Sequence, residues 1–396
     1  MASRSQMTGL GKAASGHRRL LVVGNGPSGI GDDGSYHVDR TCGQVLLGLA
    51  ERGFDVTFAQ PIEPLGALLN YYGCVLPPDR VRAIGLDKAR PLASLRGVAA
   101  VARAMLRADF VHLFFPGTLP RLIARFLRRL GIPYGLYLRG DQFSDEGSDA
   151  RIVRHARFVL AVSEGLADRV SGLNAQVGVV RPSFELTAKD AHVRQFGPLR
   201  ERAARLLFVG RIDETKGVPE LIAATERLRA RGVRVELKLV GFGYLHEALS
   251  ARFPDEDGQA IRVVGALDDR AQLLRAYQEA DIFVLPTHQE GFPRVLYEAM
   301  IKSAVVVTTM VGGIPGVMKD EVNCLAVPVD DAEAIARAIE RLVDDPGLME
   351  RLATAGLATV LNIFGAYPTQ EQALHARLTA GQAGVTHSTG EEASSG

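Results

Sequence analysis

The stretch RLLFVGRIDETKG, residues 205–217, shows how this chain is built. It begins with an apolar run typical of a buried strand and ends in charged residues and a glycine, which is typical of a loop that leads into a helix. The helical pattern PELIAATERLRARG follows at 219–232, and another apolar run, VELKLVG, occupies 235–241. Alternation of this kind predicts a parallel sheet with helices on both faces.

The same alternation divides the chain into two series of strand-like runs. The first series comprises RLLVVG at 19–24, DVTFAQ at 55–60, DFVHLFF at 109–115, PYGLYL at 133–138 and FVLAVS at 158–163. The second series continues from RLLFVG and VELKLVG with IRVVGA at 261–266, DIFVLP at 281–286 and AVVVTT at 304–309. We therefore predict an α/β chain with two doubly wound parallel-sheet domains, Rossmann-like in layout, that face each other across a cleft.

The polar, proline-containing stretch between the two series sets the domain boundaries. We expect a first domain at 18–185, a linker at 186–204 and a second domain at 205–355. The small, polar ends at 1–17 and 381–396 are predicted to be disordered tails. Doubly wound sheets bind their ligands beyond the carboxyl ends of the strands, so the functional site is expected in the cleft.

The composition limits which kinds of binding partner and which cellular compartment are expected. Of the 396 residues, 47% are hydrophobic, and the net charge of +1 gives no electrostatic reason to expect nucleic acid. Cys42, Cys74 and Cys324 lie far apart, which indicates a reducing compartment and no cysteine-bound metal. The sequence contains neither a signal-peptide core nor an apolar run of about 18 residues, so we expect a cytoplasmic protein.

The stretch GNGPSG at 24–29 matches the G-x-G-x-x-G fingerprint of dinucleotide-binding folds. Its context differs, because the next helical pattern begins several residues later and Gln60 ends the following strand where a ribose-binding acid is expected. We favour a mobile loop that lines the cleft and approaches a phosphate or sugar, with a plain surface turn as the alternative. An oxidoreductase that uses NAD or FAD is the minor interpretation.

Two basic residues follow the first strand of the second domain. Arg211 and Lys216 are expected at the carboxyl edge of the sheet, where a planar guanidinium and an ammonium group suit a diphosphate. In the competing interpretation, Arg211 and Lys216 are simply solvated cations in a loop. A later loop, MVGGIPGVM at 310–318, offers a close backbone approach at the same edge or forms a simple turn.

The stretch HQEGFPRVLYEAM at 288–300 combines two acids with a helix start. Glu290 precedes the helix and Glu298 lies about two turns into it. The free N–H groups of the helix start, from Gly291 to Val295, are expected to point at an anion, and Phe292 and Pro293 of this segment are expected to line the same site. Acids beside an anion accept hydrogen bonds from hydroxyls, and a hydroxylated group attached to a diphosphate is a nucleotide sugar.

The order of these motifs carries more weight than any single one. FVGR with Lys216-Gly217, then GFG at 241–243, EGFPRVLYEAM and GGIP, resembles the glycosyltransferase family 4 group (glycosyl transferases group 1), which has the two-domain GT-B fold. The resemblance covers roughly residues 205–355 and extends to the first domain only in layout. It implies a retaining hexosyltransferase that moves sugar from a nucleoside diphosphate donor, such as a UDP-sugar, to a hydroxyl acceptor in glycan, polysaccharide or glycoside biosynthesis.

The resemblance also implies roles for individual residues and segments. By this likeness Arg211 and Lys216 hold the diphosphate, Glu290 the donor-sugar hydroxyls and Glu298 the ribose, while Gly34 and Ser35 approach the phosphates from the first domain. The first domain would bind the acceptor, the second domain the nucleotide sugar, and residues 356–380 would form a helix that crosses back to the first domain. Fixed cations would do the work of a metal ion, so no metal or other cofactor is expected.

Arg139-Gly140-Asp141 stand where family members often carry His-Gly. Arg139 would then bind a phosphate or the acceptor, and Asp141 would orient the acceptor hydroxyl. The same departure suits a non-catalytic homologue that binds nucleotide sugar and acts as a regulator or scaffold, and a GT-B-fold epimerase is a further alternative. The sugar, the base, the acceptor and the oligomeric state stay open.

Three other features allow two interpretations each. The helical pattern TLPRLIARFLRRLG at 118–131 separates the arginines of the segment Arg121–Arg129 from apolar residues, which predicts peripheral contact with the inner face of an anionic membrane or a packed helix with a solvated face. His112 is either a packed histidine or a catalytic one. His288 either lines the sugar pocket or has a structural role.

Overall fold

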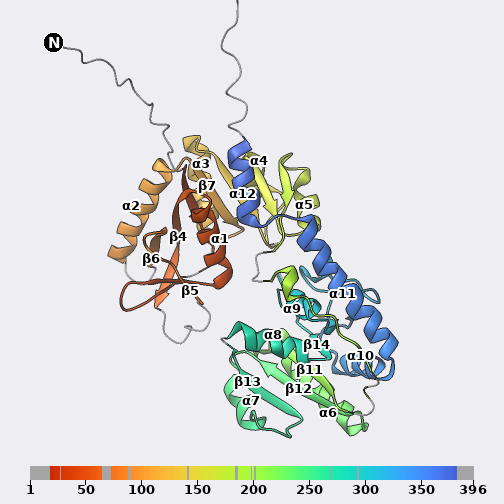
Figure 1. The fold of residues 1–396 in the computed structure, drawn as a ribbon. Helices are drawn as coiled ribbons and strands as arrows, with labels where there is room; N and C mark the ends of the chain where they lie inside the picture. The colour runs from red at the N-terminus through yellow and green to blue at the C-terminus, as the bar shows by residue number, and fades with distance from the viewer. Residues whose placement is uncertain are drawn as a thin grey trace, which may run out of the picture.

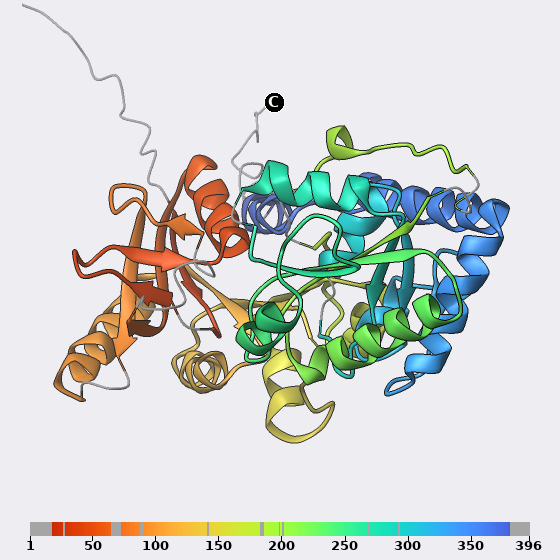
Figure 2. The same ribbon diagram turned by 90° about the horizontal axis from the view of Figure 1, so that it is seen from below.

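The computed structural model describes residues 18–26, 28–64, 73–87, 91–140, 142–182, 186–197, 199, 202–267, 269–291 and 294–380, and the structural statements below concern these residues. They form two α/β units, each built on its own sheet, which lie one above the other in Figure 1; Figure 2 looks at them from below, so that parts of the two units overlap in that view. The predicted fold class is confirmed. The predicted tails at 1–17 and 381–396 lie outside the described residues.

The first sheet has a parallel centre in the order β10-β9-β8-β7-β1-β4, with β6 also paired to β4. The strands of this centre are β1 Arg18–Val23, β4 Phe54–Pro64, β6 Val81–Asp87, β7 Phe110–Phe115, β8 Tyr134–Leu138, β9 Phe158–Ala161 and β10 Val177–Val179. Leu20 in β1 lies between Val56 in β4 and Phe110 in β7. All five strand runs expected for this domain are strands, because strands buried on both faces have continuous apolar sequences.

A small addition at one edge of this sheet was not predicted. Strands β2 Ser28–Ile30 and β3 Tyr36–Val38 pair antiparallel, and β3 also pairs with β5 Cys74–Val75. The stretch 24–29 therefore leads from β1 into a strand that pairs with the end of β4, and no helix begins there. A helix start is what a dinucleotide fingerprint requires, so the fingerprint interpretation is wrong for this stretch.

Helices cover both faces of the first sheet. Helix α1, Arg40–Glu51, and helix α12, Gln370–Thr379, pack on one face together with Leu20 and Val22. Helices α2 Pro91–Arg107, α3 Thr118–Leu130 and α4 Gly147–His155 pack on the other face. Helix α5, Glu164–Ser171, follows β9.

The second sheet is wholly parallel, in the order β13-β12-β11-β14-β15-β16. Its strands are β11 Ala204–Val209, β12 Val235–Val240, β13 Ile261–Gly265, β14 Ile282–Leu285, β15 Val305–Thr308 and β16 Leu325–Ala326. The helices around it are α6 Val218–Ala230, α7 His246–Arg252, α8 Arg270–Glu279, α9 Arg294–Ile301, α10 Ala332–Asp344 and α11 Pro346–Ala366. All five expected strand runs are strands here too.

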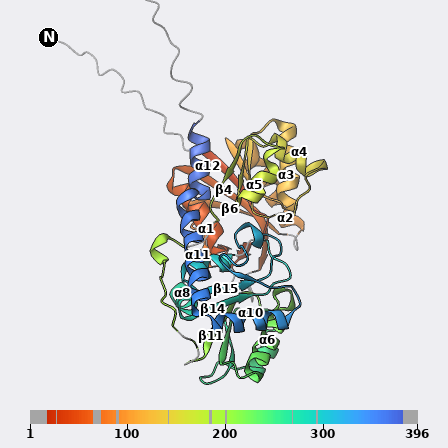
Figure 3. The same cartoon turned by 90° about the vertical axis from the view of Figure 1, so that its right-hand side faces the viewer.

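Two segments connect the units. Helix α11 runs along α9 and β15 of the second unit and leads into α12, whose Leu374 is buried in the core of the first unit (Figure 3). The segment predicted as a linker packs against the second unit, where Lys302 Nζ donates to the carbonyl of Asp190 and Arg194 pairs with Asp281 at 2.8 Å. Among the described helices, none is long and apolar enough to cross a membrane.

Candidate functional site

The loops at the carboxyl ends of the second sheet are bonded to one another through their backbones. After β11 and β12, the N–H of Ile212 donates to the carbonyl of Phe242 at 3.0 Å. The N–H of His288, after β14, donates to the carbonyl of Thr215 at 2.9 Å. The loop after β15 joins them, since the N–H of Gly313 donates to the carbonyl of Glu290 at 3.0 Å. The motifs that are scattered along the sequence therefore meet at one edge of the sheet.

Glycine is required at two of these junctions. Gly312 has φ +54°, and a Cβ there would lie 1.8 Å from the carbonyl oxygen of Glu290. Gly217 has φ +70°, and a Cβ there would lie 2.1 Å from the carbonyl oxygen of Pro286. Any other residue would push the loops apart. These glycines hold the backbones that carry Lys216 and Glu290 in contact.

Lys216 and Glu290 form the centre of the candidate site. Lys216 Nζ lies 2.8 Å from Glu290 Oε2 and donates a second bond of 3.3 Å to the carbonyl of Gln289. Their side chains are only 14% and 17% exposed, so the charges are screened less than those of a surface pair. Asp213 caps the short turn that carries Lys216, because its Oδ1 accepts from the N–H of Lys216 at 3.1 Å.

Arg211 joins this arrangement through Asp213. Its Nη1 lies 3.3 Å from Asp213 Oδ2, and its side chain is 71% exposed. The same carboxylate thus contacts Arg211 and the backbone of Lys216. The Arg211 side chain is therefore mostly open to solvent, at the edge where Lys216 is held.

Glu298 is bonded to a residue that the sequence did not point to. The hydroxyl of Tyr277 in α8 donates to Glu298 Oε2 at 2.8 Å. Burial raises the pKa of Tyr277 well above its usual value, and the neighbouring Glu298 adds to this, so the hydroxyl keeps its proton. Glu298 lies in the described part of helix α9, Arg294–Ile301.

The remaining predicted site residues are spread over both units. Gly291 directly follows Glu290 and is exposed, while Phe292, Pro293 and Asp141 lie outside the described residues. Gly34 and Ser35 lie in the turn between β2 and β3, where Asp33 accepts from both the N–H and the hydroxyl of Ser35. Those bonds lie within the turn, and the approach of Gly34 and Ser35 to a phosphate stays a prediction.

His288 stands between two acids beside the candidate site. Its Nε2 lies 3.1 Å from Asp330 Oδ1 and 3.8 Å from Glu220 Oε1. The three side chains are the one group among the described residues with the composition and spacing to hold a metal ion, with ligand atoms within 4.8 Å of one another. Asp330 is 69% exposed, so an ion bound there would be open to solvent.

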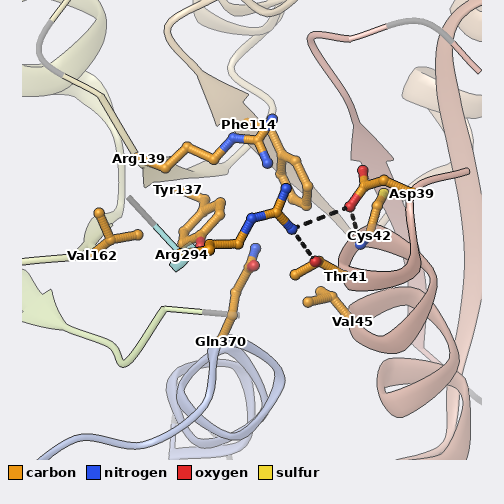
Figure 4. A pocket seen from close by; sticks show the side chains of 10 residues that line it. All are labelled: Asp39, Thr41, Cys42, Val45, Phe114, Tyr137, Arg139, Val162, Arg294 and Gln370. Carbon is orange, nitrogen blue, oxygen red and sulfur yellow. Dashed lines mark hydrogen bonds and ion pairs between the residues drawn. The ribbon is translucent and has the colours of Figure 1, made fainter. Parts of the chain in front are cut away.

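A pocket of about 230 Å³ lies between the two units, and both contribute to its wall (Figure 4). It is lined by Asp39, Thr41, Cys42, Val45, Phe114, Tyr137, Arg139, Val162, Arg294 and Gln370. Arg294, at the first turn of α9, reaches across to α1, where it donates to the hydroxyl of Thr41 and lies 3.9 Å from Asp39 Oδ1. The structure therefore places Arg139 in this pocket, as one of two arginines that line it.

His112 lies beneath this pocket as a packed, neutral histidine. It is completely buried, and burial lowers its pKa to about 3. Its Nε2 lies 2.9 Å from Gln370 Nε2, which ties the start of α12 to the first sheet. A histidine with that pKa and no exposure has no direct access to a substrate, so the packed interpretation accounts for it.

Comparison with known proteins places this geometry in a wider group. Residues 203–345 match the family model described as glycosyl transferases group 1. The chain is 28% identical over 260 residues to D-inositol 3-phosphate glycosyltransferase of Thermobifida fusca, and the match covers 59% of this chain and 59% of that relative. The chain thus spans about three fifths of that curated relative's length.

Two solved structures share the fold over nearly the whole chain. Sucrose-phosphate synthase from Thermosynechococcus elongatus superposes with a TM-score of 0.65 and 19% identity, covering 92% of this chain and 100% of that one. Anabaena Alr3699/HepE, solved in complex with UDP-glucose, gives a TM-score of 0.60 and 18% identity, covering 93% and 100%. The two units described above together make the GT-B fold.

Proposed function

We propose that this chain, whose second domain belongs to the glycosyl transferases group 1 family, transfers a sugar from a nucleoside diphosphate sugar to a hydroxyl acceptor. The observation that carries the proposal is the contact between Lys216 and Glu290 at the edge where four loops meet. An ammonium group and a carboxylate held 2.8 Å apart provide one charge for a diphosphate and one acceptor for sugar hydroxyls. The proposal specifies the acceptor only by its class, which is a glycan, a polysaccharide or a glycoside.

Each residue has a distinct part in the proposed reaction. Cleavage of the bond between sugar and diphosphate builds negative charge on the leaving diphosphate, which Lys216 and the exposed guanidinium of Arg211 stabilise from fixed positions. Glu290 accepts hydrogen bonds from hydroxyls of the donor sugar. Glu298, oriented by the hydroxyl of Tyr277, accepts from the ribose of the nucleotide.

The proposal includes retention of configuration at the transferred carbon. The acceptor hydroxyl attacks from the face that the diphosphate leaves, and the departing phosphate oxygen takes the hydroxyl proton. The reaction then needs no enzyme nucleophile, and Glu290 serves only to bind and orient. Support for this part comes from the resemblance of the second domain to a group of retaining enzymes.

Metal independence is also part of the proposal. Two cations of this chain, Arg211 and Lys216, stand where the leaving charge develops, so the neutralisation that a divalent ion would supply is already present. The cluster of Glu220, His288 and Asp330 offers ligands for a cation. No step of the proposed reaction passes through it.

Peripheral contact with an anionic membrane completes the proposal. Helices α2 and α3 pack on the same face of the first sheet, and neither contains an acidic residue. Their outer surfaces combine arginines with exposed apolar side chains, namely Leu95, Leu106, Leu122, Phe126 and Leu130, which are 47–66% exposed. A surface that is both basic and apolar complements anionic lipid headgroups and the acyl boundary below them.

Vesicle sedimentation tests this contact. The protein should sediment with phosphatidylglycerol vesicles and not with phosphatidylcholine vesicles, and added salt should release it. The double variant Leu122→Ser, Phe126→Ser should lose binding, whereas Val193→Ser, an apolar residue 78% exposed elsewhere, should keep it. Equal binding by the double variant would refute this surface.

The transfer itself is tested with a panel of UDP-, GDP- and ADP-sugars, with UDP-glucose first because the structural relative from Anabaena was solved with it. The purified chain should release nucleoside diphosphate from one donor, and nuclear magnetic resonance should show the anomeric configuration of the donor in the product. Lys216→Ala should lower this release about 100- to 1,000-fold. If a donor binds but nucleoside diphosphate is not released with any acceptor, the result would favour the non-catalytic homologue.

A further inference from the structure

The pocket between the two units is separate from the residues assigned to the donor. None of Arg211, Lys216, Glu290 and Glu298 lines it. Its wall comes mainly from the first unit, through α1 and the ends of β7 and β8, with Arg294 as the contribution of the second unit. A compound in this pocket would therefore lie on the acceptor side of the cleft.

The pocket has more positive charge than its own acid can balance. Arg139 contacts Asn25 Oδ1 at 3.3 Å and lies over the ring of Phe114 at 5.9 Å, and no carboxylate pairs with it among the residues the structure describes. Arg294 is 43% exposed and lies 3.9 Å from Asp39, the one acid in the lining. Asp39 already caps α1, since its Oδ1 accepts from the N–H of Cys42 at 3.1 Å.

A buried polar atom in the same wall also lacks a partner. Gln370 is 1% exposed, and its Oε1 has no hydrogen-bond partner among the described residues, while its Nε2 faces His112. Figure 4 shows the side chain of Gln370 rising from α12 toward Arg294. A buried amide oxygen without a donor costs stability unless a bound molecule supplies one. A hydroxyl is a donor that an acceptor of sugar must carry.

We propose that this pocket binds an acceptor that carries a phosphate or carboxylate beside its hydroxyls, with Arg139 and Arg294 on the anion and Gln370 on a hydroxyl. This proposal rests on the proposed function and specifies its acceptor class. Planar guanidinium groups suit both anions, because they donate two parallel hydrogen bonds to a pair of oxygens. The two arginines come from opposite domains, so the anion would also join the two halves of the cleft.

Thermal-shift and calorimetric titrations with saturating UDP test the proposal. The probes are glucose 6-phosphate, glucuronate, glucose and inorganic phosphate. Glucose 6-phosphate or glucuronate should raise the melting temperature and glucose should not. Arg139→Gln and Arg294→Gln should each weaken that binding about 10-fold or more, because each variant loses charge-assisted hydrogen bonds to the anion. The shift caused by UDP alone should be unchanged in both variants.

Controls separate the possible outcomes. Arg252→Gln should behave as the wild type, because Arg252 of α7 forms an exposed pair with Glu226 of α6. The melting temperature of each variant without ligand reports whether it folds, and Arg139→Lys, which keeps the charge without the planar fork, should recover only part of the affinity. A parallel titration of UDP-glucuronate against UDP-glucose tells whether the anion belongs to the donor sugar. A preference for UDP-glucuronate that depends on Arg139 would overturn the assignment to the acceptor.

Three further results would also overturn it. The first is equal affinity for glucose and glucose 6-phosphate, and the second is unchanged affinity for glucose 6-phosphate in both arginine variants. The third is that inorganic phosphate binds as tightly as glucose 6-phosphate, which would mean an adventitious ion only. Each of these leaves the proposed function intact as long as UDP still binds and Lys216→Ala still removes that binding. Failure of UDP and every other nucleoside diphosphate to bind would instead count against the proposed function.

Discussion

Lys216 and Glu290 are 74 positions apart in the chain, yet their side chains meet at 2.8 Å. The contact depends on Gly217 and Gly312, which let the loops after β11, β14 and β15 approach closely. The residue types were predictable, because arginine, lysine and paired acids suit a nucleotide sugar. Their contact was not, since it depends on how three separate loops pack.

Loss of either charge of this pair is predicted to remove most of the activity. Lys216→Ala should lower kcat about 100- to 1,000-fold, as the loss of one preorganised group at a developing charge does. Glu290→Gln removes the carboxylate that binds and orients the donor sugar, so it should lower kcat/KM for the donor. Initial-rate measurements with the donor found in the panel check this. Arg252→Ala, at an exposed pair between α7 and α6, is the matched control and should retain wild-type rates. Near-normal turnover in Lys216→Ala would contradict the role of Lys216.

Tyr277 and Arg294 are among the candidate-site residues that sequence reasoning missed. Tyr277 lies in an amphipathic helix where an aromatic residue is expected to fill the core, and only its hydroxyl bond to Glu298 shows another role. Arg294 stands within a recognised motif, but at a position where the motif specifies no residue type. Its contact with α1 exists only because the two domains face each other.

The buried His112 predicts a specific sensitivity to acid. Its pKa in the folded chain is about 3 and its unfolded value is 6.5, so below pH 6.5 the unfolded state takes up a proton that the folded state does not. The free energy of unfolding should therefore decrease as the pH is lowered, by about 2 to 3 kcal/mol between the unfolded pKa of 6.5 and about pH 4.5. Urea unfolding of His112→Gln should show a smaller loss over this window. His155→Gln, at an exposed position, should follow the wild type.

At the scale of elements, the strands with continuous apolar sequences were predictable, whereas β6, a seven-residue strand interrupted by Arg82 and Gly85, and the strands of two or three residues were not. Ten apolar runs became strands because parallel strands buried on both faces have continuous hydrophobic sequences. The small strands β2, β3 and β5 contain two or three residues each, which is too short for any hydrophobic period. Of the stretch expected as a cleft loop, Ser28 and Gly29 therefore lie in β2, whereas residues 24–26 lie outside any strand.

The segment before β11 is fixed to the second sheet by a buried carboxylate. Asp281 is 2% exposed, and although burial raises its pKa, hydrogen bonds from Arg202 and from the backbone of Arg205 hold it below its usual value. Asp281→Asn should therefore cost about 3–5 kcal/mol, the range for breaking a buried pair. Thermal unfolding measures this. Asp109→Asn, at the exposed pair with Arg19, should change little.

Helix α12 is expected to stabilise the first domain although it comes last in the chain. Leu374 is completely buried in that domain's core, so Leu374→Ala should cost about 2–5 kcal/mol in urea unfolding. Leu130→Ala, at a position 52% exposed on α3, removes the same atoms from the surface and should cost far less. Equal losses would mean that α12 contributes nothing to the first domain.

At the scale of the whole molecule, the fold separates two tasks. The second domain gathers the groups proposed for the donor on four loops, and the first domain supplies most of the pocket proposed for the acceptor. The sequence predicted the two sheets and the cleft between them, since each strand–helix series specifies one doubly wound sheet. It did not predict which side chains cross the cleft, because such contacts depend on the relative placement of the domains.

The assignment of charge neutralisation to Arg211 and Lys216 predicts transfer without a divalent ion. Activity should be unchanged after prolonged treatment with EDTA, and added Mg²⁺ or Mn²⁺ should not raise it. Loss of activity in EDTA, restored by a divalent ion, would contradict this. The triple variant Glu220→Gln, His288→Gln, Asp330→Asn would then show whether the ion sits at that cluster.

Calorimetric titration of UDP into the wild type and Lys216→Met tests the central claim most directly, because it measures the affinity for the diphosphate and requires neither the sugar nor the acceptor. We predict one site per chain in the wild type and at least a 10-fold weaker site in Lys216→Met, with no change in Arg252→Ala, since a charged hydrogen bond contributes about 1.5–3 kcal/mol. Equal affinity in the wild type and Lys216→Met would show that the diphosphate is not held where Lys216 and Glu290 meet.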